Sequence, residues 1–307
     1  MNASDLRVVL IGTPEFSVAS FEKILAAGYN VVGVITAPDR PAGRGMKLRH
    51  SAVKDFALAN DLNILQPTRL KSPEFVDQLK ALKADIQVVI AFRMLPELVW
   101  NMPKLGTINL HASLLPNYRG AAPINWAIIN GEVETGLSTF RLKHEIDTGN
   151  ILLQKKVQIS IDDNAGSLHN KLMQDGADLM LQTLEGILSN ALEEQPQRFT
   201  EQDKKAPKIF KPDCQINWDR NGIDVINHIR GLSPYPTAFT TLHNQKLKVY
   251  RASFTAENHT QFPGTLSTDN ANFVGFYCLD GLVTLDEVQL EGRRKMPIGD
   301  LLRGLKT

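Results

Sequence analysis

The sequence predicts an α/β protein in two parts: a doubly wound, mostly parallel sheet of Rossmann-like type, followed by a small OB-like β-barrel. Three observations favour this fold class. The length of 307 residues suits two domains that each bury a core. Short runs rich in Val and Ile alternate with helix patterns up to about residue 190, as in a parallel sheet. Beyond Ala191 the pattern changes to short strands joined by tight turns.

The first strand-turn-helix unit shows how these elements follow one another. Residues 8–11 form an apolar run that predicts a buried strand. Thr13 then supplies a helix cap, Pro14 a first-turn proline, and Gly28 the residue that ends the helix.

The rest of the first part continues in the same way. Strands are expected over residues 31–36, 86–90 and 107–110, and helices over residues 51–60, from Ser72 onward, and over residues 164–189. We therefore assign the first domain to residues 1–190.

A linker and a second domain follow. Residues 193–212 are polar and carry four lysines at their basic end, which is typical of an exposed connection; we place the linker at residues 191–207. Residues 208–307 then form the barrel domain. A helix is expected over residues 223–232, and hairpins turn at His243-Asn244-Gln245 and at Asp280-Gly281. Strand order and closure of the barrel cannot be derived from one sequence.

Composition excludes several classes. Lys and Arg number 34 against 33 Asp and Glu, so any affinity for nucleic acid must come from local patches. The two cysteines, Cys214 and Cys278, are too few for a disulfide framework and lack the spacing of zinc ligands, so we expect a cytoplasmic protein without a metal. Neither a signal peptide nor a membrane span is indicated.

Ligands of a doubly wound sheet bind beyond the carboxyl ends of its strands. The first such loop, Gly12-Thr13-Pro14, has one glycine where a dinucleotide fingerprint needs three, which argues against a nicotinamide enzyme. The sequence also lacks a phosphate loop, a nucleophile elbow and a zinc-protease helix.

The richest candidate site combines Asn109, His111 and Asp147. Asn109 and His111 are two residues apart at a strand end, so their side chains leave one face of the sheet. With a carboxylate, this set suits direct attack of an amine on a carbonyl: an amide stabilises the oxyanion, a histidine donates or shuttles a proton, and a carboxylate accepts one. From spacing alone the simpler interpretation stays open, in which the Asn-x-His pair is structural and Asp147 forms a turn.

The motifs resemble those of the 10-formyltetrahydrofolate-dependent formyltransferases. The stretch Asn109 to Pro116 and Asp147-Thr148-Gly149 are shared with the wider family. The loop Pro38 to Gly45, the segment Ile229 to Pro236 and the appended barrel resemble its tRNA-specific members. The resemblance covers essentially the whole chain.

The resemblance implies a reaction and its residues. A formyl group would pass from 10-formyltetrahydrofolate to the α-amine of methionine on initiator tRNA, with Asn109, His111 and Asp147 as the catalytic residues. The family's folate-contacting segment falls on Ser113, Leu114, Leu115 and Pro116. Phe92, Met94 and Leu95 follow another strand end and could wall a flat pterin ring, although ordinary core packing explains each of them equally well.

Basic residues predict where RNA would bind. Arg40, Arg44 and Lys47 lie on a glycine-containing loop without acidic residues, which can follow a phosphate backbone. Lys208, Lys211, Lys246 and Lys248 would add a second surface on the barrel. In isolation, a solvated charge run is the better interpretation of the loop.

Two other functions stay open. A formyltransferase acting on a small amine, such as glycinamide ribonucleotide or an amino sugar, would share the catalytic core but would need neither basic loop nor barrel. A non-catalytic RNA-binding protein would not need Asn109, His111 and Asp147. We expect a monomer.

Overall fold

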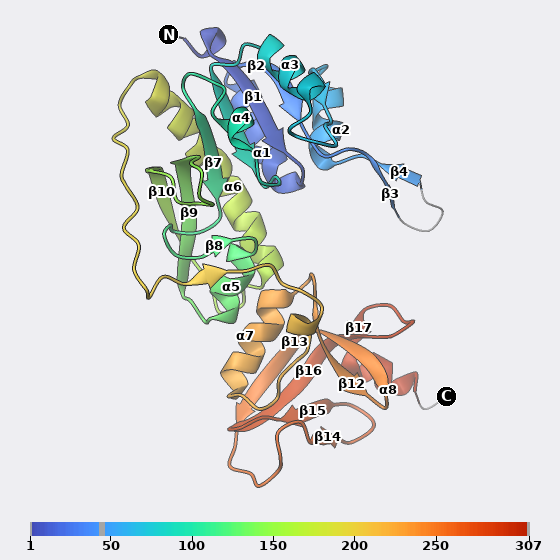
Figure 1. Ribbon diagram of the computed structural model, residues 1–307. Helices are drawn as coiled ribbons and strands as arrows, with labels where there is room; N and C mark the ends of the chain where they lie inside the picture. Colours follow the sequence, from blue (N-terminus) through green and yellow to red (C-terminus); the bar gives the residue numbers. More distant parts are fainter. Residues whose placement is uncertain (1, 43–46, 306–307) are drawn as a thin grey trace. The chain divides into compact units, whose positions relative to one another are not determined.

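The computed structural model describes residues 2–42 and 47–305 (Figure 1). The chain folds into two compact units, and neither is one continuous segment. The first comprises Met1–Arg119, Gly136–Val157 and Asn170–Lys204; the second comprises Gly120–Thr135, Gln158–His169 and Lys205–Thr307.

The first unit is built on a seven-stranded sheet in the order β10-β9-β7-β6-β1-β2-β5. Its strands are β1 (Arg7–Gly12), β2 (Asn30–Ile35), β5 (Ile64–Leu65), β6 (Ile86–Ile90), β7 (Thr107–His111), β9 (Glu134–Arg141) and β10 (Ile151–Gln158). Pairing is parallel from β5 through β7, whereas β9 runs antiparallel to β7. The predicted mostly parallel, doubly wound sheet is confirmed.

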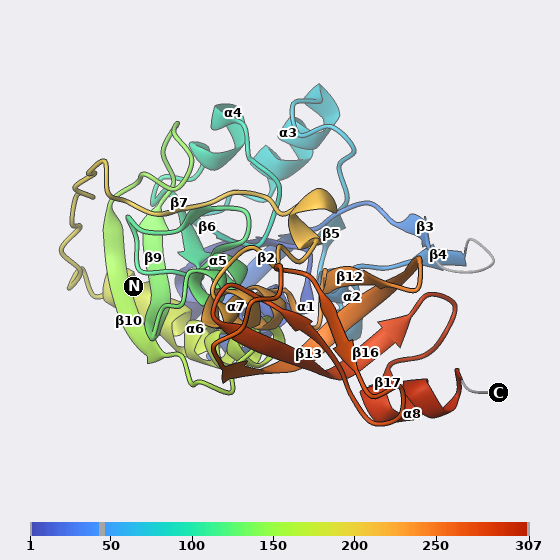
Figure 2. The same ribbon diagram turned by 90° about the horizontal axis from the view of Figure 1, so that it is seen from below.

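Helices cover both faces of this sheet, as Figures 1 and 2 show. They are α1 (Glu15–Ala26), α2 (Ala52–Ala59), α3 (Pro73–Ala81), α4 (Glu97–Trp100) and α6 (Ala165–Leu188). On one face, Ile11 and Val89 pack with Phe75 of α3 and Val99 of α4. Ile11 pairs with Val89, and Val89 pairs with Asn109, so Asn109 belongs to this α3–α4 face.

The opposite face of the sheet lies close to one glycine of α6. Leu110, next to Asn109 on β7, points away from the α3–α4 face. A Cβ atom at Gly176 of α6 would lie 2.8 Å from the Leu110 side chain. Helix α6 therefore packs closely on the face that Leu110 lines, and it does not cover the face of Asn109.

One predicted helix start is wrong. Pro14, not Thr13, is the N-cap residue of α1, and no side chain caps this helix. The first turn is fixed by Ser17 instead, whose hydroxyl donates to the carbonyl of Ile90 at 2.7 Å. A Cβ at Gly12 would lie 2.6 Å from that hydroxyl, so Gly12 makes room for the start of α1. The predicted start at Ser51 is confirmed, because its hydroxyl accepts the Lys54 backbone N–H.

The sequence patterns did not reveal β10, α4 or α5 (Pro123–Ile129). Strand β10 shows no clean alternation, because three consecutive residues at its centre, 154–156, are all polar and exposed. The helices α4 and α5 are too short for a 3.6-residue period to stand out. Two short strands, β3 (Arg40–Ala42) and β4 (Lys47–Arg49), pair antiparallel beyond β2.

The second unit contains a curled antiparallel sheet that corresponds to the expected small barrel. Its order is β12-β13-β16-β15-β14, with β17 added to β16. These strands are β12 (Ala238–Leu242), β13 (Gln245–Ala256), β14 (Leu266–Thr268), β15 (Val274–Tyr277), β16 (Gly281–Leu290) and β17 (Met296–Pro297). The helices α7 (Gly222–Leu232) and α8 (Ile298–Arg303) contribute Val225, Ile229 and Leu301 to its core.

The sequence predicted the first hairpin turn correctly and the second turn one residue too late. His243 and Asn244 both have positive φ, and Leu242 pairs with Gln245, so the first turn is confirmed. The second lies one residue earlier than predicted, at Leu279-Asp280, because the backbone N–H of Cys278 donates to the Gly281 carbonyl. A Cβ at Gly281 would lie 2.2 Å from the Thr255 carbonyl, so this glycine serves strand packing rather than the turn. Within the described ranges, no helix is long and apolar enough to span a membrane.

Candidate functional site

Asn109 and His111 stand at the carboxyl end of β7, two residues apart and on one face. His111 is 8% exposed, while Asn109 is half-buried. Among the described residues, the Asn109 carboxamide makes no hydrogen bond to another side chain or to the backbone, so both of its N–H groups are available to a ligand.

The orientation of His111 is set by a group that sequence patterns did not reveal. Its Nε2 lies 2.9 Å from the carbonyl oxygen of Tyr118. Because a carbonyl can only accept, Nε2 is the protonated nitrogen in this hydrogen bond. Nδ1 then faces the Asp147 carboxylate, with Oδ2 at 3.9 Å. This distance is too long for a direct hydrogen bond but places both groups beside the same small volume.

Asp147 reaches this position by a path that the sequence did not indicate. Strand β9 is antiparallel to β7, and its last residue, Arg141, pairs with Ile108 near the beginning of β7. The chain must therefore return along β7 by about 10 Å, at ~3.3 Å per residue, to reach His111. Asp147 ends this return with φ of 56°, a left-handed conformation that is uncommon outside glycine.

Close packing holds the returning loop against the sheet. A Cβ at Gly149 would lie 1.5 Å from the carbonyl oxygen of Arg141, so only glycine fits there. The loop's two ends are joined by Glu194, which accepts from Arg141 Nε at 2.9 Å and from Asn150 Nδ2 at 3.1 Å. Burial raises the pKa of the Glu194 carboxyl, but the hydrogen bonds from Arg141 and Asn150 outweigh it, so that this pKa lies below its ordinary value.

The segment Ser113 to Pro116 forms the turn directly after His111. Ser113 is fully buried, and its hydroxyl donates to the Asn117 carbonyl at 2.6 Å. The backbone N–H of Leu115 donates to Ser138 Oγ at 3.0 Å. Leu114 and Pro116 are half-buried. The buried members of this segment are thus held by β9, which leaves Leu114 and Pro116 as the members that a ligand can reach.

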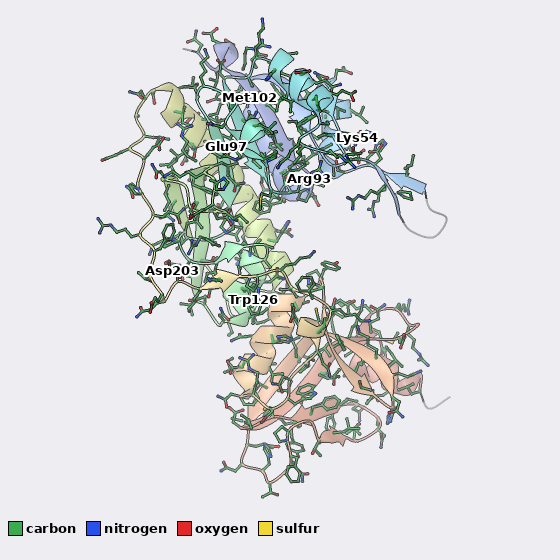
Figure 3. The ribbon with its side chains drawn as sticks, in the orientation of Figure 1. Lys54, Arg93, Glu97, Met102, Trp126 and Asp203 are labelled. Carbon is green, nitrogen blue, oxygen red and sulfur yellow. The ribbon has the colours of Figure 1, made fainter. Side chains whose placement is uncertain are left out.

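The three apolar residues expected to wall a pterin ring have different environments. Leu95 is 7% exposed and packs in the core, which supports the packing interpretation for this residue. Met94 is 70% exposed. Phe92 is half-buried, and the Arg93 guanidinium carbon lies 5.6 Å from its ring centroid. Arg93, which Figure 3 labels, also donates to the backbone carbonyls of Pro67 and Thr68, so it ties this loop to the segment that follows β5.

Arg40 and Lys47 lie on the β3–β4 hairpin, and Arg40 is exposed. Arg44 lies outside the described residues, as does the side chain of Lys47. Nearby Lys54 is not available to a ligand, because its Nζ donates to Asp39 Oδ2 at 2.5 Å (Figure 3). The hydrogen bonds from Lys54 and Gln66 lower the pKa of the Asp39 carboxyl.

The four lysines expected on the barrel all belong to the second unit. Lys208 and Lys211 are exposed, and Lys246 and Lys248 are half-buried. Burial lowers the pKa of Lys246, and the charges of Lys211 and Lys248 lower it further, so these three side chains form one basic cluster. Lys246 Nζ lies 3.7 Å from the centroid of the Phe239 ring. The structure therefore brings at least three of the four predicted lysines together.

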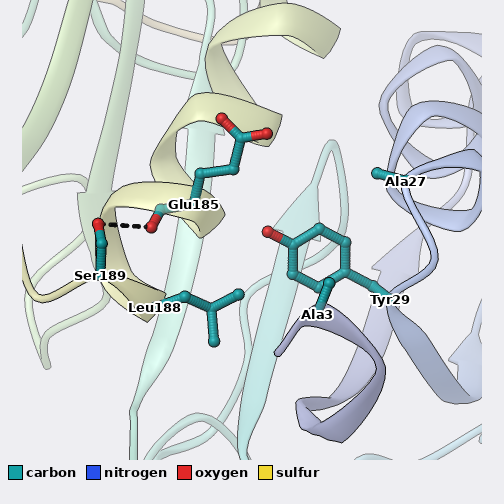
Figure 4. A pocket seen from close by; sticks show the side chains of 6 residues that line it. All are labelled: Ala3, Ala27, Tyr29, Glu185, Leu188 and Ser189. Carbon is teal, nitrogen blue, oxygen red and sulfur yellow. Dashed lines mark hydrogen bonds between the residues drawn. The ribbon is translucent and has the colours of Figure 1, made fainter. Parts of the chain in front are cut away.

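A separate pocket of about 440 Å³ opens at the amino end of the parallel strands (Figure 4). It is lined by Ala3, Ala27, Tyr29, Glu185, Leu188 and Ser189. Burial raises the pKa of the Tyr29 hydroxyl, and the Glu185 charge raises it further. None of the residues predicted from the sequence lines this pocket.

The chain is similar in sequence to known protein families and to known proteins. Residues 6–184 match the formyl transferase family, and residues 208–306 match the formyl transferase C-terminal domain. The chain is 48% identical to a methionyl-tRNA formyltransferase of Bacteroides fragilis over 99% of this chain and 96% of that relative. It is 46% identical to a methionyl-tRNA formyltransferase of Flavobacterium johnsoniae over 98% of this chain and 96% of that relative.

A solved structure shares the fold. The N-formyltransferase of Helicobacter canadensis, in complex with folinic acid and dTDP-3-aminofucose, superposes with a TM-score of 0.70 at 21% identity and covers 95% of this chain and 100% of its own. The sequence matches extend over nearly the whole of both chains, and the sheet and the Asn109–His111–Asp147 site lie within the first matched segment. The chain therefore belongs to the formyl transferase family.

Proposed function

We propose that this protein transfers the formyl group of 10-formyltetrahydrofolate to the α-amino group of methionine carried on initiator tRNA. The observation that carries the proposal is the convergence of the Asn109 carboxamide, the His111 ring and the Asp147 carboxylate at the carboxyl end of β7. The full-length similarity to methionyl-tRNA formyltransferases favours the acceptor.

The site supplies each group that amine formylation needs. Attack of the amine on the formyl carbon places negative charge on the formyl oxygen, and the Asn109 N–H groups can donate to it. Because Tyr118 engages Nε2, His111 has only Nδ1 left for proton exchange with substrate. The Asp147 carboxylate, 3.9 Å from Nδ1, accepts the proton that the attacking amine must lose. That proton then goes to N10 of the departing tetrahydrofolate, which balances the transfer.

We assign the folate to the carboxyl edge of the sheet, beside Leu114, Pro116 and Phe92. Each of these side chains is half-buried, so part of its apolar surface is accessible to a ligand. We assign the RNA to the β3–β4 hairpin and to the cluster of Lys211, Lys246 and Lys248, with Lys208 beside it. This proposal places the catalytic function in residues 1–190 and an RNA-binding function in residues 208–307, within the cytoplasm where tRNA is charged.

One experiment tests the acceptor. The protein is incubated with 10-formyltetrahydrofolate and methionylated initiator tRNA, and formylmethionine is detected after the ester is hydrolysed. Glycinamide ribonucleotide and an amino sugar nucleotide serve as competing acceptors under the same conditions. Formylation of the tRNA at a far higher kcat/KM supports the proposal. Preferential formylation of either small amine would replace the tRNA as the acceptor, and an absence of transfer to all three would remove the enzymatic assignment.

A further inference from the structure

Residues 194–204, which we call the strap, follow α6 in the sequence and belong to the first unit. The sequence indicates only a polar linker here. In the structure, however, the strap contacts both loops that carry the groups around His111: the loop of Asp147 and the turn of Tyr118.

Gln197 connects the strap to the Asp147 loop. Its Nε2 donates to the carbonyl oxygen of Asp147 at 2.9 Å and to that of Gly149 at 2.7 Å. Its other amide atom, Oε1, is buried and has no hydrogen-bond partner among the described residues, so the side chain acts only as a donor. Both hydrogens of one amide thus fix the two carbonyls that flank Thr148, immediately after the left-handed Asp147.

The far end of the strap holds the Tyr118 turn. The backbone N–H of Tyr118 donates to the Lys204 carbonyl at 2.6 Å, and the Lys204 N–H donates to Asn117 Oδ1 at 3.0 Å. Arg119 Nη2 lies 3.8 Å from Asp203 Oδ2, and the Arg119 guanidinium carbon lies 4.4 Å from the centroid of the Phe199 ring. Tyr118, with φ of 59°, is therefore fixed on its N–H side by the strap and on its carbonyl side by His111.

We infer that the strap is a positioning element: Gln197 sets the Asp147 carboxylate, and the Lys204 backbone sets the Tyr118 carbonyl that orients His111. This inference rests on the proposed function. Neither Gln197 nor Lys204 lies next to the reacting atoms; each acts through a residue that does. Catalytic geometry tolerates little displacement, so loosening either contact should slow the chemical step while substrate binding changes little.

The decisive variant is Gln197→Met, which keeps an unbranched side chain of similar length but removes both donors. We expect kcat to fall about 10-fold to 100-fold, the range seen when an outer hydrogen-bond partner of a site is removed. KM for folate and for tRNA should change less than about 3-fold, because uniform binding is untouched. The matched control is Gln195→Met: Gln195 is on the same strap and exposed, and its bonds to Ile151 are made by its backbone, so kcat should be unchanged.

A double-mutant cycle with Asp147→Asn separates positioning from a purely structural effect. If Gln197 acts through Asp147, Gln197→Met should cost little in the Asp147→Asn background. Three results would each overturn the inference: losses of kcat that multiply in the double variant, a rise in KM at constant kcat, or a loss of kcat in Gln195→Met equal to that in Gln197→Met. Should Gln197→Met not fold, Gln197→Asn, which keeps the amide but withdraws it by one methylene, is measured in the same cycle.

The same cycle distinguishes the two proposals. Near-normal kcat in Asp147→Asn alone would overturn the catalytic assignment and, with it, the proposed site. A large loss in Asp147→Asn together with wild-type kcat in Gln197→Met and Gln197→Asn would overturn only the positioning role of the strap.

Discussion

His111 uses its two ring nitrogens for different purposes. Nε2 is committed to the Tyr118 carbonyl at 2.9 Å, and Nδ1 is directed toward Asp147 at 3.9 Å. The ring is 8% exposed, so its orientation cannot be set by solvent. A backbone carbonyl is a suitable partner for this purpose, because it accepts a hydrogen bond at any pH at which the fold persists.

Removal of either side chain should slow the reaction without unfolding the chain. We predict that Asn109→Ala lowers kcat by about 100-fold to 1,000-fold, the usual loss for one oxyanion donor, and that His111→Ala lowers it by a similar factor because proton exchange at Nδ1 is lost. The double variant should lose less than the product of the single losses, because both side chains act on one tetrahedral intermediate. Single-turnover rates at saturating folate and tRNA measure this, with thermal unfolding as the control. Turnover close to wild type in either single variant would contradict the assignment.

At the scale of a single element, helix α7 contains a half-buried histidine, His228. Burial lowers the pKa of His228, and the Arg220 charge lowers it further; a hydrogen bond to the Cys214 backbone and the Asp213 charge offset only part of this. Its Nε2 is buried without a hydrogen-bond partner among the described residues. The folded state therefore holds His228 neutral at a pH where the unfolded chain is protonated.

This shift predicts how the second unit responds to acid. The unfolded histidine binds a proton near pH 6.5, whereas the folded one binds it only at lower pH, so the free energy of unfolding decreases as the pH falls below about 6.5. His228→Gln should reduce that decrease. Urea unfolding at pH 7.5 and 5.5 measures it in a Trp100→Phe background, in which fluorescence reports Trp126 and Trp218 of the second unit. An equal decrease in both proteins would contradict the role of His228.

The β3–β4 hairpin should act on RNA and not on folate. We predict that replacing Arg40, Arg44 and Lys47 with alanine weakens initiator tRNA binding and flattens its dependence on salt by about one log-log unit for each lost phosphate contact. Folate binding should be unchanged. Filter binding across a salt series tests this, and a triple replacement of the exposed Lys71, Lys80 and Lys83 with alanine, on and beside α3, controls for the same change in net charge. An unchanged slope in the triple variant would remove the hairpin from the RNA surface.

At the scale of the whole molecule, the chain does not divide where its sequence pattern changes. Residues 120–135 precede the linker but belong to the second unit. Ile129 of α5 is 6% exposed and packs with Val225 and Ile229 of α7. Asn125 Nδ2 donates to the Gly231 carbonyl at 2.8 Å. Trp126 Nε1 donates to the Pro207 carbonyl at 2.8 Å (Figure 3).

This arrangement predicts the behaviour of a shortened chain. Truncation after Ala206 removes α7 and leaves the apolar face of α5 in water, so the fragment should bind a hydrophobic dye and aggregate. Ile129→Ser should reduce dye binding in the fragment, yet it should destabilise the full chain by about 2–4 kcal/mol, because it buries a hydroxyl in place of an alkyl group. Opposite signs in the two chains are the expected result. A fragment that stays monomeric and does not bind dye would contradict it.

Much of the local structure could be predicted, because strands and turns depend on the burial and the residue types of neighbouring positions in the sequence. Residues 86–90 form β6 as expected, since five apolar or buried positions in a row are typical of a strand covered on both faces. Asn109 and His111 share a face because every second residue of a strand does. The tight turn at His243 and Asn244 follows from residues that tolerate positive φ.

By itself, the sequence determined the mostly parallel sheet, the change to short strands and the pairing of Asn109 with His111 on one face, because these depend on periods of a few residues. Tertiary structure alone decided that β9 runs antiparallel and returns Asp147 to His111, that Tyr118 orients the ring, and that Gln197 holds the loop. These contacts join residues as far as 50 positions apart through backbone carbonyls, and every residue type carries the same carbonyl. The pattern of side chains therefore does not predict these contacts, which form only when the fold brings distant segments of the chain together.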